Sequence, residues 1–458
     1  MADSLRAGLG KSSTVTVHQG CLISPTIAAP ADGSLFDPVS DEPGVHLEIR
    51  SAAGATVYET HFPTSVVTWW DGLPDVVHQP GAEVVMHALY RPSVGGPHVL
   101  GAAGVGRLRV VVDGVPVAEA TNVLPRDVVE ALSRPPELRV PLQLVAGKEI
   151  DVRFEHGPNA RGHNAGFAAM RLGITPWVEE GVMLDQAVEA ATAAEVAVVV
   201  VGSADGTESE GYDRETMRLP GRQDELVRRV AAANPNTVVV VNSGMPVLMP
   251  WAGEVAAIMQ VWFPGQAFGE ALADALFGAA EPGGRLPVSV PRAEVDAPVL
   301  SAHPLAGDLV YGEGLLVGYR GYDRHGPEPL FPFGHCLGYS EWSYESLVPA
   351  SETITAEQEL DLLVTVRNSG KRAGHEVVQV YLEGPDDEPS RPHRILAGFA
   401  AVSAVPGEQA GVHIVVPGRA FARFDERKGD WIWSPGTYTL RAGRSSRDLR
   451  LSAKVVLR

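Results

Sequence analysis

An alternation of apolar strands and amphipathic helices in the middle of the chain limits its fold more than any other feature of the sequence. The run Val196–Val201 is apolar throughout, as expected of a strand buried on both faces. Further strands are predicted at 237–241 and 256–262, and helices at 183–194, 222–233 and 266–277. Strands and helices that alternate at this spacing are typical of parallel βαβ units with helices covering a sheet. The centre of the chain is therefore predicted to be an α/β layer structure.

The segment before residue 180 has a different pattern, in which short β-branched runs alternate with turns. Examples are Val45–Ile49, Val66–Trp70, Leu108–Val112 and Leu138–Leu144. The dipeptide Asp113-Gly114 indicates a hairpin, because these residues tolerate the positive φ angles of a tight turn between strands. We expect a β-sandwich or jelly roll here.

After about Tyr339 the pattern returns to β. Strands are predicted at 360–366, 376–382, 411–416 and 436–441, a spacing typical of an immunoglobulin-like sandwich. No cysteine pair crosses it, which favours the fibronectin type III variety. The fold expected from the whole chain is multidomain α/β plus all-β, with an N-terminal tail at 1–20, a β module at 21–180, an α/β-sandwich domain at 181–340 and a fibronectin type III-like domain at 341–458.

Charge and composition exclude several classes of protein. The formal net charge of −19 argues against nucleic-acid binding and against adhesion to anionic membranes. No phosphate loop, dinucleotide fingerprint or metal-ligand cluster occurs, so we expect no cofactor and no metal. No apolar run has the length of a signal peptide or a membrane span, which predicts a cytoplasmic protein.

The last forty residues are an exception to the acidic composition. From Arg419 to Arg458 there are ten Lys or Arg residues against four Asp or Glu residues. A solvated face is the favoured interpretation of such a charge run. The alternative is a contact surface for an acidic neighbour.

The loop Glu208–Arg214 (ESEGYDR) is the strongest candidate for chemistry. It contains the carboxylates Glu208, Glu210 and Asp213, and it follows the predicted strand that ends at Val201. In such sheets, functional loops follow the carboxyl ends of the strands. Enzymes that cleave a glycosidic bond usually use two carboxyl groups as catalytic residues. In the alternative interpretation these are exposed loop acids with a structural Asp213–Arg214 ion pair, and spacing alone favours that view.

Six short sequence motifs, found in a fixed order in the centre of the chain, favour the catalytic interpretation of this loop. They are ESEGYDR with the following LPGRQ, VNSGMPVLMPW (241–251), FPGQAFGEALADALFG (263–278), PGGRLPVSVP (282–291), YGEGLLVGYRGYD (311–323) and LFPFGHCLGYS (330–340). The segment that contains them resembles the α/β-sandwich domain of glycoside hydrolase family 3, the β-glucosidase family. The region 360–451 is similar to the fibronectin type III-like domain of that family. The β region with GAAGVGRLRVVVD (101–113) is similar to the protective-antigen-14 module that some members carry inserted in the α/β-sandwich domain.

The resemblance implies roles for the loop residues. Glu210 corresponds to the acid/base of a retaining hydrolase. Glu208 is a weaker candidate for that role, and its carboxylate could raise the pKa of Glu210. Asp213 and Arg214 are expected to hold the loop in shape. The substrate implied is a β-glucoside or oligosaccharide. Residues that bind the sugar are not identified, although Trp251, Trp262 and Phe263 could stack on a ring if they are not core residues. His335 is expected to be structural.

The catalytic nucleophile of the family lies on an N-terminal barrel domain, in a Ser-Asp-Trp-like context. The only Asp-Trp here is Asp430-Trp431, in the fibronectin-like region. We therefore expect the barrel, and the opening stretch of the sandwich domain before the inserted module, to be missing. The chain would supply the acid/base without the nucleophile, as a truncated product or as the partner of a separate barrel subunit. The alternatives are a non-catalytic carbohydrate-binding or scaffold protein, and a fragment that does not fold.

Overall fold

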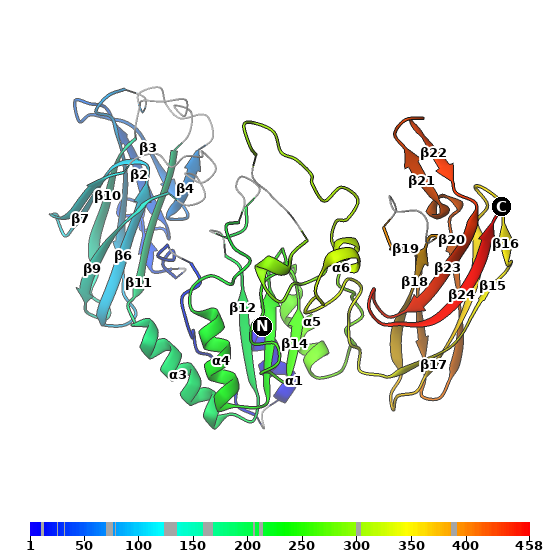
Figure 1. The fold of residues 1–458 in the computed structure, drawn as a ribbon. Helices are drawn as coiled ribbons and strands as arrows, with labels where there is room; N and C mark the ends of the chain where they lie inside the picture. The colour runs from blue at the N-terminus through cyan, green and yellow to red at the C-terminus, as the bar shows by residue number, and fades with distance from the viewer. Residues whose placement is uncertain are drawn as a thin grey trace.

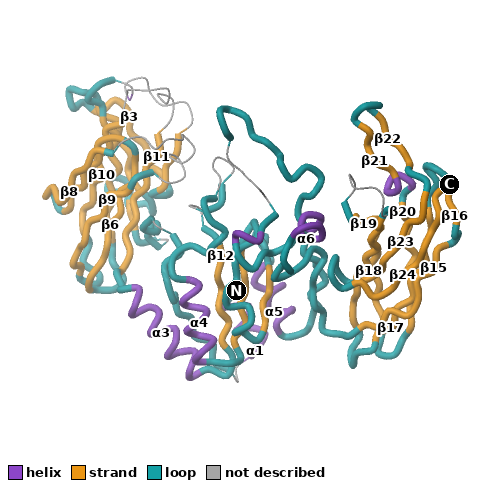
Figure 2. Tube along the Cα trace, in the orientation of Figure 1, coloured by secondary structure: helices purple, strands orange, loops and turns teal. Residues whose placement is uncertain are grey.

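The computed structural model describes the chain except for residues 11–12, 25, 32, 70–76, 78, 123–134, 159–167, 205–206, 210–213, 299–303 and 386–391. The described residues form three regions that lie side by side, with a β module at one end, an α/β region in the middle and a β sandwich at the other end (Figure 1). Helices gather in the middle region, and strands dominate the two others (Figure 2). The fold class predicted from the sequence is confirmed.

Two antiparallel sheets build the β module. One has the strand order β3-β2-β5-β10-β7-β8 with β1 paired to β5, and the other has the order β4-β11-β6-β9. The strands are β1 (Leu35–Phe36), β2 (Val45–Arg50), β3 (Thr56–Phe62), β4 (Val66–Trp69), β5 (Glu83–Tyr90), β6 (Gly96–Gly104), β7 (Gly106–Val112), β8 (Val115–Thr121), β9 (Glu137–Leu144), β10 (Ile150–Pro158) and β11 (Ala168–Pro176). Asp113 and Gly114 connect β7 to β8 with φ angles of 50° and 77°, as the hairpin prediction requires.

His156 on β10 gives the β module a dependence on pH. The ring is buried, its Nε2 donates to the carbonyl of Val105 at 2.7 Å, and its Nδ1 has no hydrogen-bond partner among the described residues. Burial lowers the pKa of His156 from 6.5 to about 4. The neutral ring therefore stabilises the fold fully above pH 6.5, and this contribution is lost as the pH falls from there toward 4.

His156→Gln is expected to reduce the acid-induced loss of stability, because glutamine keeps a donor for the Val105 carbonyl and cannot ionise. The pKa shift corresponds to a stabilisation on the order of 3 kcal/mol at neutral pH. Melting temperatures of both proteins measured from pH 7 to pH 4.5 check this. An equal fall in the two proteins would contradict the assignment to His156.

The middle region contains a parallel sheet with the order β12-β13-β14. Figure 1 shows helices α3 and α4 on one side of this sheet and α1 with α5 on the other. The elements are α1 (Ala2–Leu9), α3 (Glu180–Ala193), β12 (Ala197–Gly202), α4 (Gln223–Ala233), β13 (Thr237–Asn242), β14 (Ala257–Gln260), α5 (Phe268–Leu276), η3 (Glu294–Asp296) and α6 (Tyr319–His325). The predicted alternation of strands and helices is confirmed.

The prediction that strand 196–201 is buried on both faces is wrong. Val199 and Val201 point into the core with Leu226 of α4, whereas Val200 is 38% exposed and Val196 is 55% exposed. Among the strands that the structure describes, β12 pairs with β13 alone and lies at one edge of the three-stranded sheet. Successive side chains of a strand point to opposite faces, so Val200 lies on the face opposite Val199 and Val201, and that face is only partly covered.

The expected N-terminal tail (1–20) and the first residue of the expected β module contribute to the middle region. Helix α1 packs against α5, and Cys21 is buried in the same core as Leu226. The chain thus belongs to the α/β region both before and after the β module. The β module therefore lies between two parts of the chain that pack in the α/β region.

The C-terminal region is a two-sheet sandwich with the strand orders β15-β17-β20 and β16-β24-β23-β18-β19, and a β21-β22 hairpin projects from it. Its elements are β15 (Trp342–Pro349), β16 (Thr353–Ile354), β17 (Leu360–Asn368), β18 (Gly374–Glu383), β19 (Arg394–Ala404), β20 (Gln409–Val416), η4 (Gly418–Phe421), β21 (Ala422–Asp425), β22 (Asp430–Trp433), β23 (Gly436–Gly443) and β24 (Leu449–Leu457). The four strands predicted here are all found. Across the described part of the chain, no helix has both the length and the apolar character needed to span a bilayer.

Candidate active site

The candidate loop leaves the carboxyl end of β12 and leads to α4. Because β12, β13 and β14 run parallel, the segments that follow them meet at one edge of the sheet. Glu210 and Asp213 lie outside the described residues. Glu208 and Arg214, the other two residues selected from the sequence, are described and lie close together.

Glu208 ties the loop to the turn that follows β13. Its side chain is 9% exposed, and its Oε1 lies 3.0 Å from Nη1 of Arg214. The backbone N–H of Gly244 donates to Oε2 at 2.8 Å, and that of Met245 donates to Oε1 at 3.3 Å. Both carboxylate oxygens of Glu208 are therefore engaged in holding two loops together.

Gly244 is required at this junction by the closeness of its neighbours. A Cβ atom added to Gly244 would lie 2.5 Å from the ring of Phe263 and 2.8 Å from Oε2 of Glu208. Trp262, which precedes Phe263, adopts a φ of 56°, a left-handed conformation that bulky residues rarely occupy. Such strain persists where surrounding contacts fix the backbone, and it often marks functional segments.

Arg214 fastens the far end of the loop. It donates from Nη1 to the carbonyl of Pro246 at 3.3 Å and from Nε to the carbonyl of Thr216 at 3.2 Å. Glu294 of η3 accepts from the Thr216 hydroxyl and from the N–H of Met217, and these bonds lower the pKa of Glu294. The sequence suggested Asp213 as the partner of Arg214, and the partner found among the described residues is Glu208.

Sequence reasoning missed the side chain that closes the base of the loop. Gln223, at the start of α4, is 1% exposed. Its Oε1 accepts from the N–H of Gly202 at 2.7 Å, and its Nε2 donates to the carbonyls of Gly202 at 2.8 Å and Pro220 at 2.9 Å. The only signal in the sequence was its place in the LPGRQ block, because a buried glutamine leaves no periodic pattern.

The aromatic candidates separate into core and surface. Trp251 is fully buried and donates from Nε1 to Asp224 at 2.9 Å, so it is a core residue. Phe263 is 62% exposed beside Gly244. His335 stacks on Phe331 with ring centroids 5.4 Å apart, and burial lowers the pKa of His335, which fits a packed, neutral ring.

The described residues include no cluster of His, Cys, Asp and Glu able to hold a metal ion. A groove of about 1060 Å³ is present, and residues of the C-terminal sandwich with Leu315 and Arg320 line it. None of the loop residues around Glu208 contributes to it. The carboxylates at the sheet edge and the groove are thus separate features.

Comparison with known proteins gives consistent matches. Residues 48–339 match the sequence profile of the glycosyl hydrolase family 3 C-terminal domain, and residues 376–446 match that of the fibronectin type III-like domain. A beta-glucosidase of Rhizobium radiobacter is 36% identical over 379 residues, which cover 81% of this chain and 46% of that protein. Thermostable beta-glucosidase B of Acetivibrio thermocellus is 40% identical over 274 residues, 60% of this chain and 36% of that protein.

A solved structure matches the whole chain. The crystal structure of the beta-glucosidase from Kluyveromyces marxianus in complex with glucose superposes with a TM-score of 0.85 at 29% identity, covering all of this chain and 55% of that chain. The chain spans about half the length of the curated relatives it matches.

Proposed function

This chain belongs to glycoside hydrolase family 3, and we propose that it supplies the acid/base half of a β-glucosidase-type active site that hydrolyses O-glycosyl bonds with retention. Glu210 is the proposed acid/base, with Glu208, Asp213 and Arg214 supporting its loop. The proposed domains are the β module at 21–180, the α/β-sandwich domain at 181–340 and the fibronectin type III-like domain at 341–458. A β-glucoside or oligosaccharide is the proposed substrate.

The engagement of Glu208 is the observation that carries this proposal. A general acid must hold a proton and release it to the leaving oxygen. Oε1 of Glu208 pairs with Arg214 and accepts the N–H of Met245, and Oε2 accepts the N–H of Gly244, so both carboxylate oxygens are occupied by contacts within the protein. Glu208 is thus better suited to positioning the loop, and Glu210, two residues further along, is left as the proton donor.

In the proposed mechanism two carboxylates act on opposite sides of the scissile bond. The nucleophile attacks the anomeric carbon while Glu210 protonates the departing oxygen, and Glu210 then removes a proton from the water that releases the sugar. The two carboxyl groups would have to lie about 5 Å apart. Asp430 is not suited to be the nucleophile, because it lies on the β21-β22 hairpin of the C-terminal sandwich and accepts from its neighbour Trp431 at 2.7 Å.

We infer that the nucleophile comes from a barrel carried by a separate subunit or by a segment of the same protein outside these 458 residues. The chain alone is expected to leave an aryl β-glucoside intact and to hydrolyse it after mixing with a family barrel polypeptide that has a Ser-Asp-Trp-like motif. Release of the phenol, measured with size-exclusion chromatography of the mixture, checks this.

The chain carrying Glu210→Gln is the control in this experiment, because it should form the same complex without turnover. Full activity of the lone chain would overturn the inferred origin of the nucleophile. Binding of glucosides that survives Glu210→Gln, with no turnover beside any barrel, would favour the non-catalytic carbohydrate-binding alternative.

A further inference from the structure

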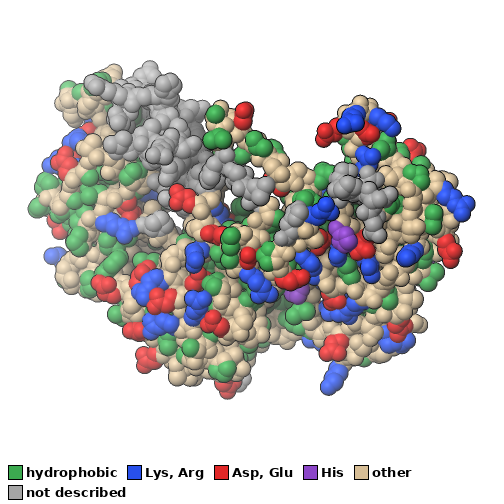
Figure 3. All heavy atoms as spheres, viewed as in Figure 1, with side chains coloured by type: hydrophobic (Ala, Val, Ile, Leu, Met, Phe, Trp, Pro, Cys, Tyr) green, Lys and Arg blue, Asp and Glu red, His purple; other side chains and the backbone are tan. Residues whose placement is uncertain are grey.

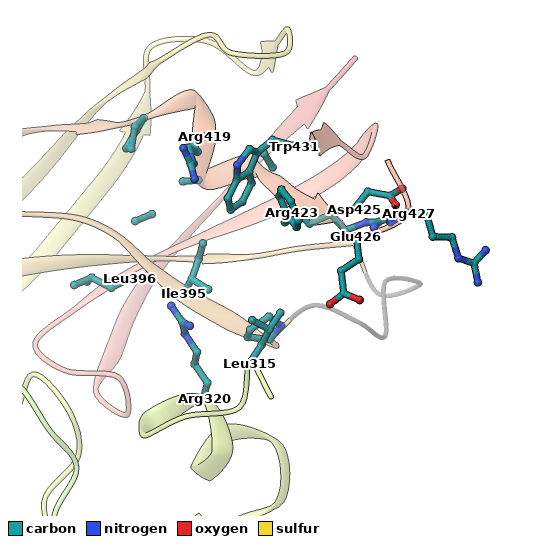
Figure 4. Close-up of a pocket in the computed structure, with 16 residues that line it drawn as sticks. Leu315, Arg320, Ile395, Leu396, Arg419, Arg423, Asp425, Glu426, Arg427 and Trp431 are labelled. Carbon is teal, nitrogen blue, oxygen red and sulfur yellow. Dashed lines mark hydrogen bonds between the residues drawn. The ribbon is translucent and has the colours of Figure 1, made fainter. Parts of the chain in front are cut away.

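The groove of about 1060 Å³ lies on the C-terminal sandwich, away from the residues of the proposed site. Edge strand β19, η4 and the β21-β22 hairpin surround it, and Leu315 and Arg320 approach it from the α/β region (Figure 4). In the space-filling view, Lys and Arg side chains lie beside Asp and Glu side chains where this hairpin projects (Figure 3). The proposed catalytic chemistry assigns no role to this surface.

Arginines dominate the charge of the groove. Arg320, Arg419, Arg423 and Arg427 line it, opposed by Asp425 and Glu426. The carboxylate of Asp425 is engaged within the hairpin turn, where it accepts the N–H groups of Arg427 at 3.0 Å and Lys428 at 3.2 Å. A chain with a net charge of −19 thus carries a local excess of positive charge here.

Arg320 and Arg419 present their guanidinium groups toward the groove. Figure 4 shows Arg320 rising from α6 toward Ile395 and Leu396. Its Nε is buried and has no hydrogen-bond partner among the described residues, and a buried donor without a partner is costly. The guanidinium of Arg419 lies over the ring of Trp431 at 3.8 Å, which fixes its plane. A guanidinium held in this way suits bidentate recognition of a carboxylate.

The rest of the lining is largely aliphatic. Leu315, Ile395, Leu396 and Ala420 provide apolar surface for side chains of similar character. The backbone N–H of Leu396 already donates to the Tyr319 hydroxyl at 2.9 Å, so a ligand strand cannot pair with β19 at this point. Recognition would therefore depend on side chains.

From this combination of fixed arginines and aliphatic surface we propose that the groove binds an extended segment of a partner polypeptide that alternates acidic and aliphatic residues. Carboxylates of the segment pair with Arg320 and Arg419, and its aliphatic side chains cover Ile395 and Leu396. An acidic glycan fits less well, because Arg419 occupies a face of Trp431 on which a sugar ring could stack. The proposal is independent of Glu210 and of the catalytic role.

A peptide-binding experiment with the full chain tests the proposal. The probe is a fluorescein-labelled peptide of alternating Glu and Val, about eight residues and so roughly 26 Å long when extended. Fluorescence anisotropy should show saturable binding that weakens with added salt, and an unlabelled peptide of alternating Lys and Val should not compete for that binding. Arg320→Gln together with Arg419→Gln is expected to weaken binding roughly tenfold or more.

The matched control is Lys454→Gln, which removes one positive charge from an exposed position of β24 outside the groove and should leave binding unchanged. Arg320→Gln alone keeps the Arg419–Trp431 stack and tests the groove if the double variant unfolds. Absence of peptide binding, or binding that neither arginine variant alters, would overturn the proposal. If an oligogalacturonate bound more tightly and displaced the peptide, the groove would be a site for acidic glycans, and the peptide proposal would be wrong.

Discussion

Glu210→Gln is expected to lower kcat for an alkyl or unactivated aryl β-glucoside by about 10²–10⁴-fold in the enzyme assembled with its barrel, the range that general acid catalysis contributes. Glutamine has nearly the same shape and cannot donate the proton that the departing oxygen needs. The loss in kcat/KM, which reports the step in which the phenol leaves, should depend on the leaving group, because a strongly acidic phenol departs without protonation. Steady-state rates on a series of aryl β-glucosides with increasingly acidic phenols measure this dependence.

Glu208→Gln is the matched control for that measurement. The substitution removes the charge that pairs with Arg214 and keeps an oxygen for the N–H of Gly244. We expect a lower melting temperature and a loss of activity that is the same for every leaving group, because the loop is held less firmly. The assignment of the acid/base would be wrong if the leaving-group dependence appeared in Glu208→Gln and not in Glu210→Gln.

Glu376→Ala is expected to lower the free energy of unfolding of the C-terminal region by about 3–5 kcal/mol, the usual cost of breaking a buried ion pair. Glu376 is fully buried on β18, with Arg285 at 2.7 Å from Oε1 and Arg444 at 2.7 Å from Oε2. Removal of the carboxylate leaves two guanidinium groups, each mostly buried, without their counter-charge. Since Arg285 follows α5, the substitution should also loosen the attachment of the sandwich to the α/β region. Urea unfolding followed by circular dichroism measures the loss.

Glu345→Ala provides the comparison on the same sandwich. Glu345 pairs with Arg367 at 2.6 Å on the surface, where the two side chains are 30% and 40% exposed. Water and salt screen an exposed ion pair. Glu345→Ala should therefore lower the free energy of unfolding by only a small fraction of the loss expected for Glu376→Ala. Similar losses of unfolding free energy in the two variants would contradict the view that burial makes the Glu376 ion pairs important for stability.

Strands and helices whose apolar residues recur with a regular period could be predicted from the sequence. The apolar run at Val196–Val201 and its helical neighbours repeat with the periods of strand and helix, and the structure contains each of them within a few residues. The turn at Asp113-Gly114 could also be predicted, because the positive φ angles of a hairpin turn depend on those two residues. The blocks around the candidate loop were sufficient to identify the family.

Contacts between distant residues could not be predicted. Nothing in the ESEGYDR loop indicates that Glu208 accepts the N–H of Gly244, because that bond depends on two parallel strands ending at one edge. The packing of α1 on α5 and the burial of Cys21 likewise depend on the chain returning to the α/β region after the β module.

The sequence by itself determined the three kinds of region, the family and the loop that carries Glu210, because propensity, periodicity and short motifs act over neighbouring residues. Tertiary structure decided that Glu208 braces that loop, that Val200 is exposed at a sheet edge, that α1 packs on α5, and that Arg320 and Arg419 line one groove. These features are set by which surfaces meet when the elements pack, and residues far apart in the chain decide that together.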